Sequence, residues 1–398
     1  MTKERPATKA SLLVTAGFFF ATFLLTRQSQ VPALAGLAAP FALSFVLLRL
    51  RPQVPALVLV PIFAYGLCSG LVSIVAGREV SDVFRFFAIT MGTLFAFHIR
   101  PTTVSVSWSL LPVTLQALIV AAISIGLSLL QDPDLAFAAR SIAQEAQWGD
   151  IYSFDGLYYR VQVVGNALLP LLFMVSLWRL GSGRVYRWMV LASLIGLVAA
   201  GNLTYALVAA LAAFIRYRAW LFATSGRATL TLLSLLVALV LAGGAVAEAF
   251  SVKFDGGDSS MGVRFDQIDA AAREVGDSPA SMLWGTGLGA PFPDGRERKY
   301  SESQYIELQS LYLFLQLGAV GTLLYLATLF YCARRFLADD GRTIFWLFLL
   351  AGSTNPYILD TNQLVATALL VCVFPRRETV GHRSRSLEWR PLPDAIGP

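Results

Sequence analysis

Residues 54–76 read VPALVLVPIFAYGLCSGLVSIVA and contain no charged side chain. A helix needs about 20 consecutive apolar residues to cross the hydrocarbon core of a bilayer, and this run is long enough. Runs of the same kind recur along the chain, which is 56% hydrophobic and 14% charged and has a mean hydropathy of +0.63. A soluble domain carries about 25% charged residues. The sequence therefore predicts an all-α polytopic membrane protein.

Twelve apolar runs predict membrane helices. Their expected bounds are 10–26, 31–50, 54–76, 82–99, 108–130, 161–178, 186–200, 203–217, 228–250, 305–332, 342–358 and 361–374. Arginine-rich connections stay in the cytoplasm, and here they fall on the same side as the basic N-terminus. The chain is expected to cross and return over 186–217 through a turn at Gly201-Asn202. Both termini are then cytoplasmic, and the first run is expected to be a retained helix rather than a cleaved signal peptide.

This topology divides the chain into six segments. They are helices one to five in 1–130, a periplasmic loop in 131–160, helices six to nine in 161–250, a large periplasmic loop with an amphipathic helix in 251–304, helices ten to twelve in 305–374 and a basic cytoplasmic tail in 375–398. Long ordered loops are usually functional. Any chemistry is therefore expected in the two long loops on the outer face.

The charge and the metal-binding residue types exclude several classes of function. The net charge of +6 is spread over short loops and has a topological use, so it does not predict nucleic-acid binding. Cys68, Cys332 and Cys372 lie in separate apolar runs and are interpreted as core residues rather than disulfides or ligands. Both histidines, His98 and His382, fall on the cytoplasmic side. We therefore expect no metal and no cofactor in the outer loops.

The helix predicted in the second loop carries two arginines of different character. Arg273 follows Asp269 by four residues, and this spacing favours an ordinary ion pair within the helix, with a substrate contact as the alternative. Arg264 has no acidic residue three or four positions away. Its guanidinium is therefore a candidate ligand for an external anion, with an ordinary loop arginine as the alternative.

Arg160 is expected where the first loop enters the membrane again, next to Tyr158 and Tyr159. An arginine and two tyrosines make a polar and aromatic rim suited to sugars and phosphate. The alternative is an arginine that reaches the membrane interface among interfacial aromatic residues. Arg85 follows Asp82 by three residues, so an internal pair competes with a role in substrate binding.

The end of the second loop supplies the remaining candidates. Glu302 precedes a membrane helix and could act as a general base for a sugar hydroxyl, although Ser301 or Ser303 nearby also fits a helix cap. Tyr305 follows as a candidate substrate contact. Three basic residues would attract a diphosphate or balance neighbouring acidic residues: Arg296, Arg298 and Lys299.

Four segments together resemble the O-antigen polymerase and ligase family of bacterial inner membranes. They are YYRVQVVGNALLP at 158–170, SSMGVRFDQIDAAAREVGDSPASMLWGTGLG at 259–289, ESQYIELQSLYLFLQLGAVGTLLYL at 302–326 and STNPY at 353–357. The resemblance implies a metal-independent glycosyltransferase of the GT-C type. Such enzymes act on undecaprenyl-diphosphate-linked oligosaccharides at the periplasmic face of the membrane and also contact membrane lipid. A chain-length regulator is a candidate partner protein.

The resemblance also assigns roles to individual residues. Arg160 and Arg264 match the family arginines that hold the diphosphate. Ligases of the family have a His-Asn pair where this chain has Glu302-Ser303, which favours an O-antigen or exopolysaccharide polymerase over a ligase. A transporter or flippase is a third possibility, because twelve helices with both ends inside is also a transporter layout. A transporter should show paired repeats and broken helices near the middle of the membrane.

Overall fold

The computed structural model describes residues 56–98, 106–145, 149–153, 158–163, 165–223, 260–276, 278–290, 308–353 and 361–376. Its α-helices are α3 (Ala56–Val75), α4 (Val80–Ala96), α5 (Val106–Leu130), α6 (Pro133–Glu145), α7 (Leu169–Trp178), α8 (Arg184–Ala200), α9 (Leu203–Ala223), α11 (Ser260–Gly276), α12 (Pro279–Trp284), α13 (Gln309–Phe336), α14 (Asp339–Ser353) and α15 (Thr361–Val373). Two strands, β1 (Gly149–Ser153) and β2 (Tyr159–Val163), form a hairpin, and η2 (Asn166–Leu168) and η3 (Leu180–Ser182) are short 3-10 helices. The predicted spans 10–26, 31–50 and 228–250 lie outside the described residues.

Three of the described helices are long and apolar enough to cross a membrane: Val58–Val75 within α3, α5 and α13. The sides of these helices are rich in exposed apolar side chains, with Val75 88% and Leu129 78% exposed. Polar side chains such as Ser109, Ser176 and Gln316 are instead buried at 0% exposure. This distribution suits a protein whose solvent is lipid, because lipid does not penalise apolar exposure. The structure thus agrees with a helical membrane protein, while the twelve predicted crossings are a finer prediction than these three helices establish.

The short helix α7 lies at the centre of the bundle. Residues 169–177 are all buried, and α7 packs against α5, α8, α9 and α14. Its 10 residues give a rod of about 15 Å, which is too short to cross a bilayer alone. The predicted membrane helix 161–178 is therefore wrong at its start. Residues up to Val163 are a β-strand, and the α-helix begins only at Leu169.

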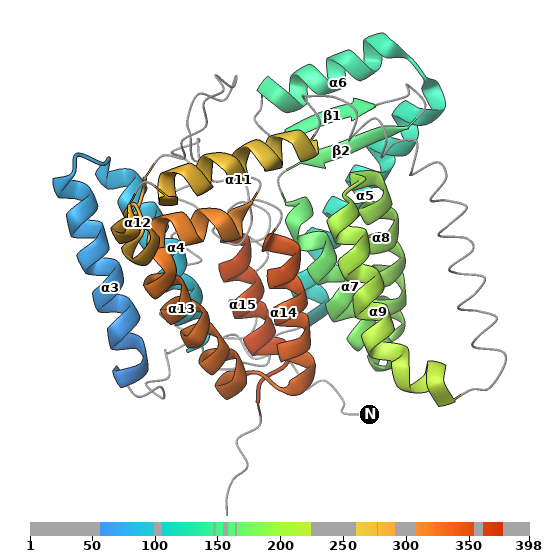
Figure 1. Cartoon of the computed structure of the whole chain (residues 1–398). Coiled ribbons are helices and arrows are strands. Elements are labelled where there is room, and N and C mark those ends of the chain that lie inside the picture. Colours follow the sequence, from blue (N-terminus) through green and yellow to red (C-terminus); the bar gives the residue numbers. More distant parts are fainter. Residues whose placement is uncertain are drawn as a thin grey trace, which may run out of the picture.

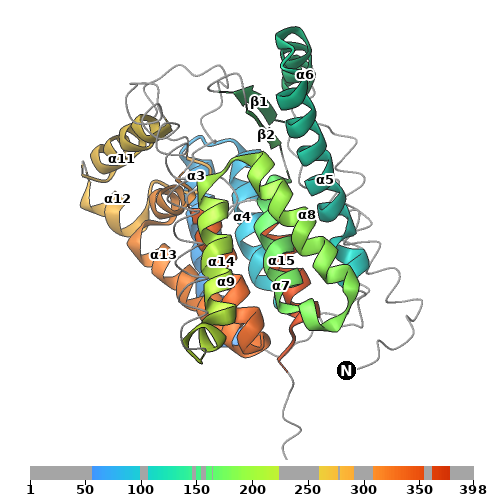
Figure 2. The ribbon, with the colours of Figure 1, turned by 90° about the vertical axis from the view of Figure 1, so that its right-hand side faces the viewer.

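The predicted loop 131–160 is largely ordered secondary structure rather than an open loop. It contains α6, all of β1 and the start of β2, so a short two-stranded hairpin accompanies an otherwise helical fold. The strands are antiparallel, and Tyr152 lies opposite Arg160. Figure 1 shows α6, β1, β2 and α11 together at one end of the bundle, which we call the hairpin end, and Figure 2 shows the same arrangement after a quarter turn. The described parts of the two predicted outer loops, α6 with the hairpin and α11, therefore lie at the same end of the molecule.

Three arginines at the ends of helices lie at the opposite end of the bundle. Arg184 starts α8, and Arg334 and Arg335 lie in the last turn of α13. The turn predicted at Gly201-Asn202 is confirmed at the hairpin end. Gly201 is left-handed (φ 59°), and Asn202 Oδ1 accepts a hydrogen bond from the backbone N–H of Thr204 at 3.0 Å.

A break divides α13 at Gly318, where the backbone has φ 62° and ψ −175°. The segment 285–290 packs against this break. The N–H of Thr286 donates to the carbonyl oxygen of Leu315 at 2.7 Å, and the hydroxyl of Tyr65 donates to that of Leu317 at 2.5 Å. These bonds satisfy carbonyl groups that the interrupted helix leaves open. The Gly-rich segment of the second predicted loop is thus partly buried among membrane helices, with Leu288 1% exposed.

Candidate functional site

The two segments that carry Arg160 and Arg264 both lie at the hairpin end. Arg160 stands on β2, and the backbone of Arg264 belongs to α11. Both elements lie at the same end of the bundle in Figures 1 and 2. They come from different halves of the sequence. Arg160 was predicted at the lip of a membrane helix, and its strand position corrects that prediction.

Side chains of α5 complete the free edge of β2. Ser124 Oγ donates to the carbonyl oxygen of Tyr159 at 2.6 Å, and the N–H of Tyr159 donates to Ser128 Oγ at 3.1 Å. Farther along the strand, Asn166 Nδ2 donates to the carbonyl oxygen of Val161 at 2.8 Å. An edge strand needs partners for its backbone polar groups. Here α5 and Asn166 supply them in place of a third strand.

Arg160 packs against the turn between α8 and α9. A Cβ atom added at Gly201 would lie 2.7 Å from Arg160 Cδ and 3.1 Å from its Nε. The aliphatic stem of Arg160 therefore occupies the space above a glycine that has no side chain. Since successive strand residues point to opposite faces, this contact fixes the face of the hairpin on which Arg160 stands.

The two tyrosines beside Arg160 are held by the protein itself. The hydroxyl of Tyr158 donates to the carbonyl oxygen of Val198, near the end of α8. Burial raises the pKa of Tyr158, and the positive charge of Arg160 opposes that shift. Tyr159 packs on a small hydrophobic cluster that includes Ile151 and Val161. Their predicted role as sugar contacts must compete with these structural contacts.

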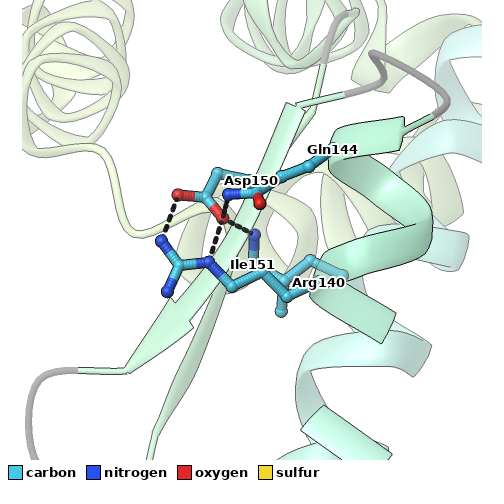
Figure 3. A network of polar contacts seen from close by, with 4 residues as sticks. All are labelled: Arg140, Gln144, Asp150 and Ile151. Carbon is cyan, nitrogen blue, oxygen red and sulfur yellow. Dashed lines mark hydrogen bonds and ion pairs between the residues drawn. The ribbon is translucent and has the colours of Figure 1, made fainter. Parts of the chain in front are cut away.

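An ion pair fastens α6 to the hairpin (Figure 3). Arg140 donates through Nε to Asp150 Oδ1 at 2.8 Å and through a terminal nitrogen to Oδ2 at 3.0 Å. Gln144 Nε2 and the N–H of Ile151 also donate to Oδ1, at 3.1 and 2.8 Å. Two-pronged contacts of this kind fix orientation as well as distance. The carboxylate of Asp150 thereby joins α6 to β1, whose partner strand carries Arg160.

The structure places the backbone of both arginines on α11. Gln267 and Ala271 are buried, at 2% and 1% exposure, and α11 packs on α12 and α13. Arg264 belongs to the first turns of this helix. Arg273 is exposed, and its Nε donates to the backbone carbonyl oxygen of Asp269 at 3.3 Å. The predicted contact with Asp269 therefore involves the backbone rather than a carboxylate pair.

Arg85 lies on a different part of the hairpin end, on the exposed surface of α4. Nearby Asp82 contacts the Gly-rich segment, since a Cβ added at Gly289 would lie 3.1 Å from Asp82 Cβ. Tyr312 of α13 donates to the carbonyl oxygen of Ala290 at 3.3 Å. The candidates Glu302, Tyr305, Arg296, Arg298 and Lys299 lie outside the described residues.

No group of three His, Cys, Asp or Glu residues within the described ranges could hold a metal ion. All three cysteines are free, and Cys332 and Cys372 are buried as predicted, whereas Cys68 is exposed.

Sequence reasoning missed Ser124, Ser128 and Gly201 as parts of the site. A signal for the serines exists, because they recur at a spacing of four residues in the apolar last third of α5. Hydroxyl groups on one stripe of such a helix indicate a polar partner. Comparison with known proteins gives no matching protein family, no matching curated protein and no matching solved structure.

Proposed function

We propose that this chain is a glycosyltransferase of a bacterial inner membrane that polymerises an O-antigen or exopolysaccharide. It transfers an undecaprenyl-diphosphate-linked glycan to a sugar hydroxyl of another lipid-linked repeat unit. The observation that supports the proposal is that β2 and α11 lie at the same end of the bundle. Each contributes one of the two arginines that match the resemblance, and both lie at one end of a helical membrane bundle.

The proposed chemistry needs positive charge where the diphosphate leaves. Charge builds up on that group as its bond to the sugar breaks, and fixed guanidinium groups near a low-dielectric membrane stabilise it. Arg160 and Arg264 have this role in the proposal. Glu302 accepts the proton of the attacking hydroxyl. Attack from the side opposite the diphosphate inverts the anomeric carbon.

A transporter is the strongest rival, and the break in α13 bears on it. Transporters often bind substrate or ions at interrupted helices near the middle of the membrane. In this chain the break is occupied by the protein's own segment 285–290. Gly289 N–H donates to Gln316 Oε1 at 2.9 Å, and the carbonyl oxygens of Leu315 and Leu317 also have partners. Because these carbonyl oxygens already have partners within the protein, the break is better explained as a structural feature than as a binding site for a transported substrate or ion.

Polymer formation tests the proposed function directly. The purified full-length chain in lipid nanodiscs should convert a lipid-linked repeat unit into a ladder of longer products on a gel. The ladder should persist in EDTA, because the guanidinium groups supply the charge that a metal would otherwise provide. Loss of the ladder in EDTA with recovery by one particular divalent cation would contradict this mechanism. Failure of the purified chain to form any ladder would contradict the polymerase itself.

The proposal also requires the hairpin end to face the periplasm. In a background without the native cysteines, Asp134→Cys on α6 should react with a membrane-impermeant maleimide added to intact spheroplasts. Ser182→Cys, at the opposite end, should react only after the membrane is opened. Both positions are exposed, so burial does not explain a difference. The reverse labelling pattern would overturn the orientation.

A further inference from the structure

The hairpin can present Arg160 to a ligand in only one register. Side chains alternate between the two faces of a strand, so a slip of one residue moves each side chain to the opposite face. Such a slip would exchange Arg160 with Tyr159 or Val161, and Val161 is fully buried at 0% exposure. Two strands alone are marginally stable. Something outside the hairpin must therefore contribute to fixing its register.

Two hydroxyl groups of α5 make the contacts that would fix it. Ser124 donates to the carbonyl oxygen of Tyr159, and Ser128 accepts from the N–H of the same residue. Both backbone polar groups of Tyr159 are thus engaged by one helix, at positions one turn apart. If the strand slipped by one residue, the N–H and C=O groups of Tyr159 would no longer lie beside the hydroxyl groups of Ser124 and Ser128. Arg160 is the next residue.

We propose that Ser124 and Ser128 are positioning residues that hold Arg160 against a diphosphate. The proposal rests on the proposed function, in which Arg160 contacts the leaving group. Gly201 completes the arrangement from the other side, because it leaves room for the Arg160 stem. The hydroxyl groups of Ser124 and Ser128 fix the position and register of β2 against α5. Gly201 leaves space for the side chain of Arg160.

The test uses the full-length chain in nanodiscs and two measurements. Hydrogen exchange of the peptide containing Tyr159 reports the docking of β2, and equilibrium binding of undecaprenyl diphosphate reports the arginine. Ser124→Ala and Ser128→Ala should each weaken binding about tenfold, the effect of one lost hydrogen bond. Ser128→Ala should also speed exchange at Tyr159. Threonine at either position keeps the hydroxyl and should restore both measurements.

Matched variants separate positioning from general destabilisation. Thr114→Ala is the control on the same helix, because Thr114 Oγ1 donates to the carbonyl oxygen of Leu110 within that helix at 2.9 Å. It should change neither measurement. In an Arg160→Ala background, the serine substitutions should weaken binding no further. Gly201→Ala should weaken binding without faster exchange at Tyr159, because it displaces the arginine and leaves the serines in place.

Three results would overturn the proposal. They are unchanged exchange in Ser128→Ala, unchanged binding in both serine variants, or an equal further loss of binding in the Arg160→Ala background. The function is judged separately by the product ladder. A ladder with unaffected serine variants rejects the positioning role alone. Serine-dependent binding without any ladder rejects the polymerase and keeps the positioning role.

Discussion

Arg264→Ala is expected to abolish the polymer ladder while the protein still folds and inserts. The backbone of this residue lies in the first turns of α11, and the proposed function assigns its guanidinium to the diphosphate. Removal of one group that stabilises developing charge costs about 100- to 1,000-fold in rate. Arg264→Lys should fail in large part as well, because an ammonium group cannot make the two-pronged contact of a guanidinium. Initial rates and apparent Tm should be measured on the same preparations.

Arg273→Ala is the matched control, because it removes the same side chain from the same helix. Arg273 is exposed, and its Nε donates to a carbonyl oxygen of its own helix. Its removal should change the rate less than about threefold, as expected for an exposed side chain with one local contact. A well-folded Arg264→Ala protein that forms full-length polymer would remove this arginine from the mechanism. Equal losses in both variants would point to a general effect on α11.

The sequence predicted the parts of the fold that follow from helical apolar runs. The spans 54–76 and 108–130 correspond to α3 (Ala56–Val75) and α5 (Val106–Leu130). The amphipathic helix predicted within 251–304 corresponds to α11 (Ser260–Gly276). Twenty apolar residues have few other stable arrangements in lipid. Such segments are therefore predictable without knowledge of their neighbours.

The hairpin was missed because its stability comes from contacts distant in sequence. YRVQVV continues into the apolar residues of α7, so the combined run looks like a single membrane helix. What makes Tyr159–Val163 a strand is its pairing with Gly149–Ser153 and the hydroxyl groups of α5. Strand preference depends strongly on such context. A short apolar run cannot be assigned to helix or strand by its pattern alone.

The glycines of the segment 285–290 are evident in the sequence, but the structural role of this segment is not. Gly285, Gly287 and Gly289 all have positive φ, and the segment fills the break that Gly318 makes in α13. The pattern of glycines indicates unusual backbone conformations. It cannot indicate which partner approaches them, because Gly285 and Gly318 are far apart in the sequence. That pairing appears only in the folded chain, and it leads to a second large expected effect.

Gly285→Ala is expected to destabilise the fold strongly. Gly285 has φ 81°, and a Cβ atom there would lie 2.6 Å from the backbone nitrogen of Gly318. Backbone cannot move aside as a flexible side chain can. Strain at a positive φ costs about 1–3 kcal/mol, and the clash adds to it, so a loss of at least about 3 kcal/mol is expected. The apparent Tm and the yield of folded protein should both fall.

Two comparison variants decide whether this loss comes from the contact between the two glycines. Gly126→Ala inserts the same methyl group within α5, where nothing lies within 4 Å, and it should leave the Tm unchanged or slightly raised. Gly318→Ala meets the same contact from the other side, because its Cβ would collide with the backbone nitrogen of Gly285. If both glycines serve one close approach, the first alanine already separates the two segments. The double variant should then lose clearly less stability than the sum of the single losses. Additive losses would mean that each glycine is needed for its own backbone conformation, and a native Tm for Gly285→Ala would mean that the packed segment does not stabilise the α13 break.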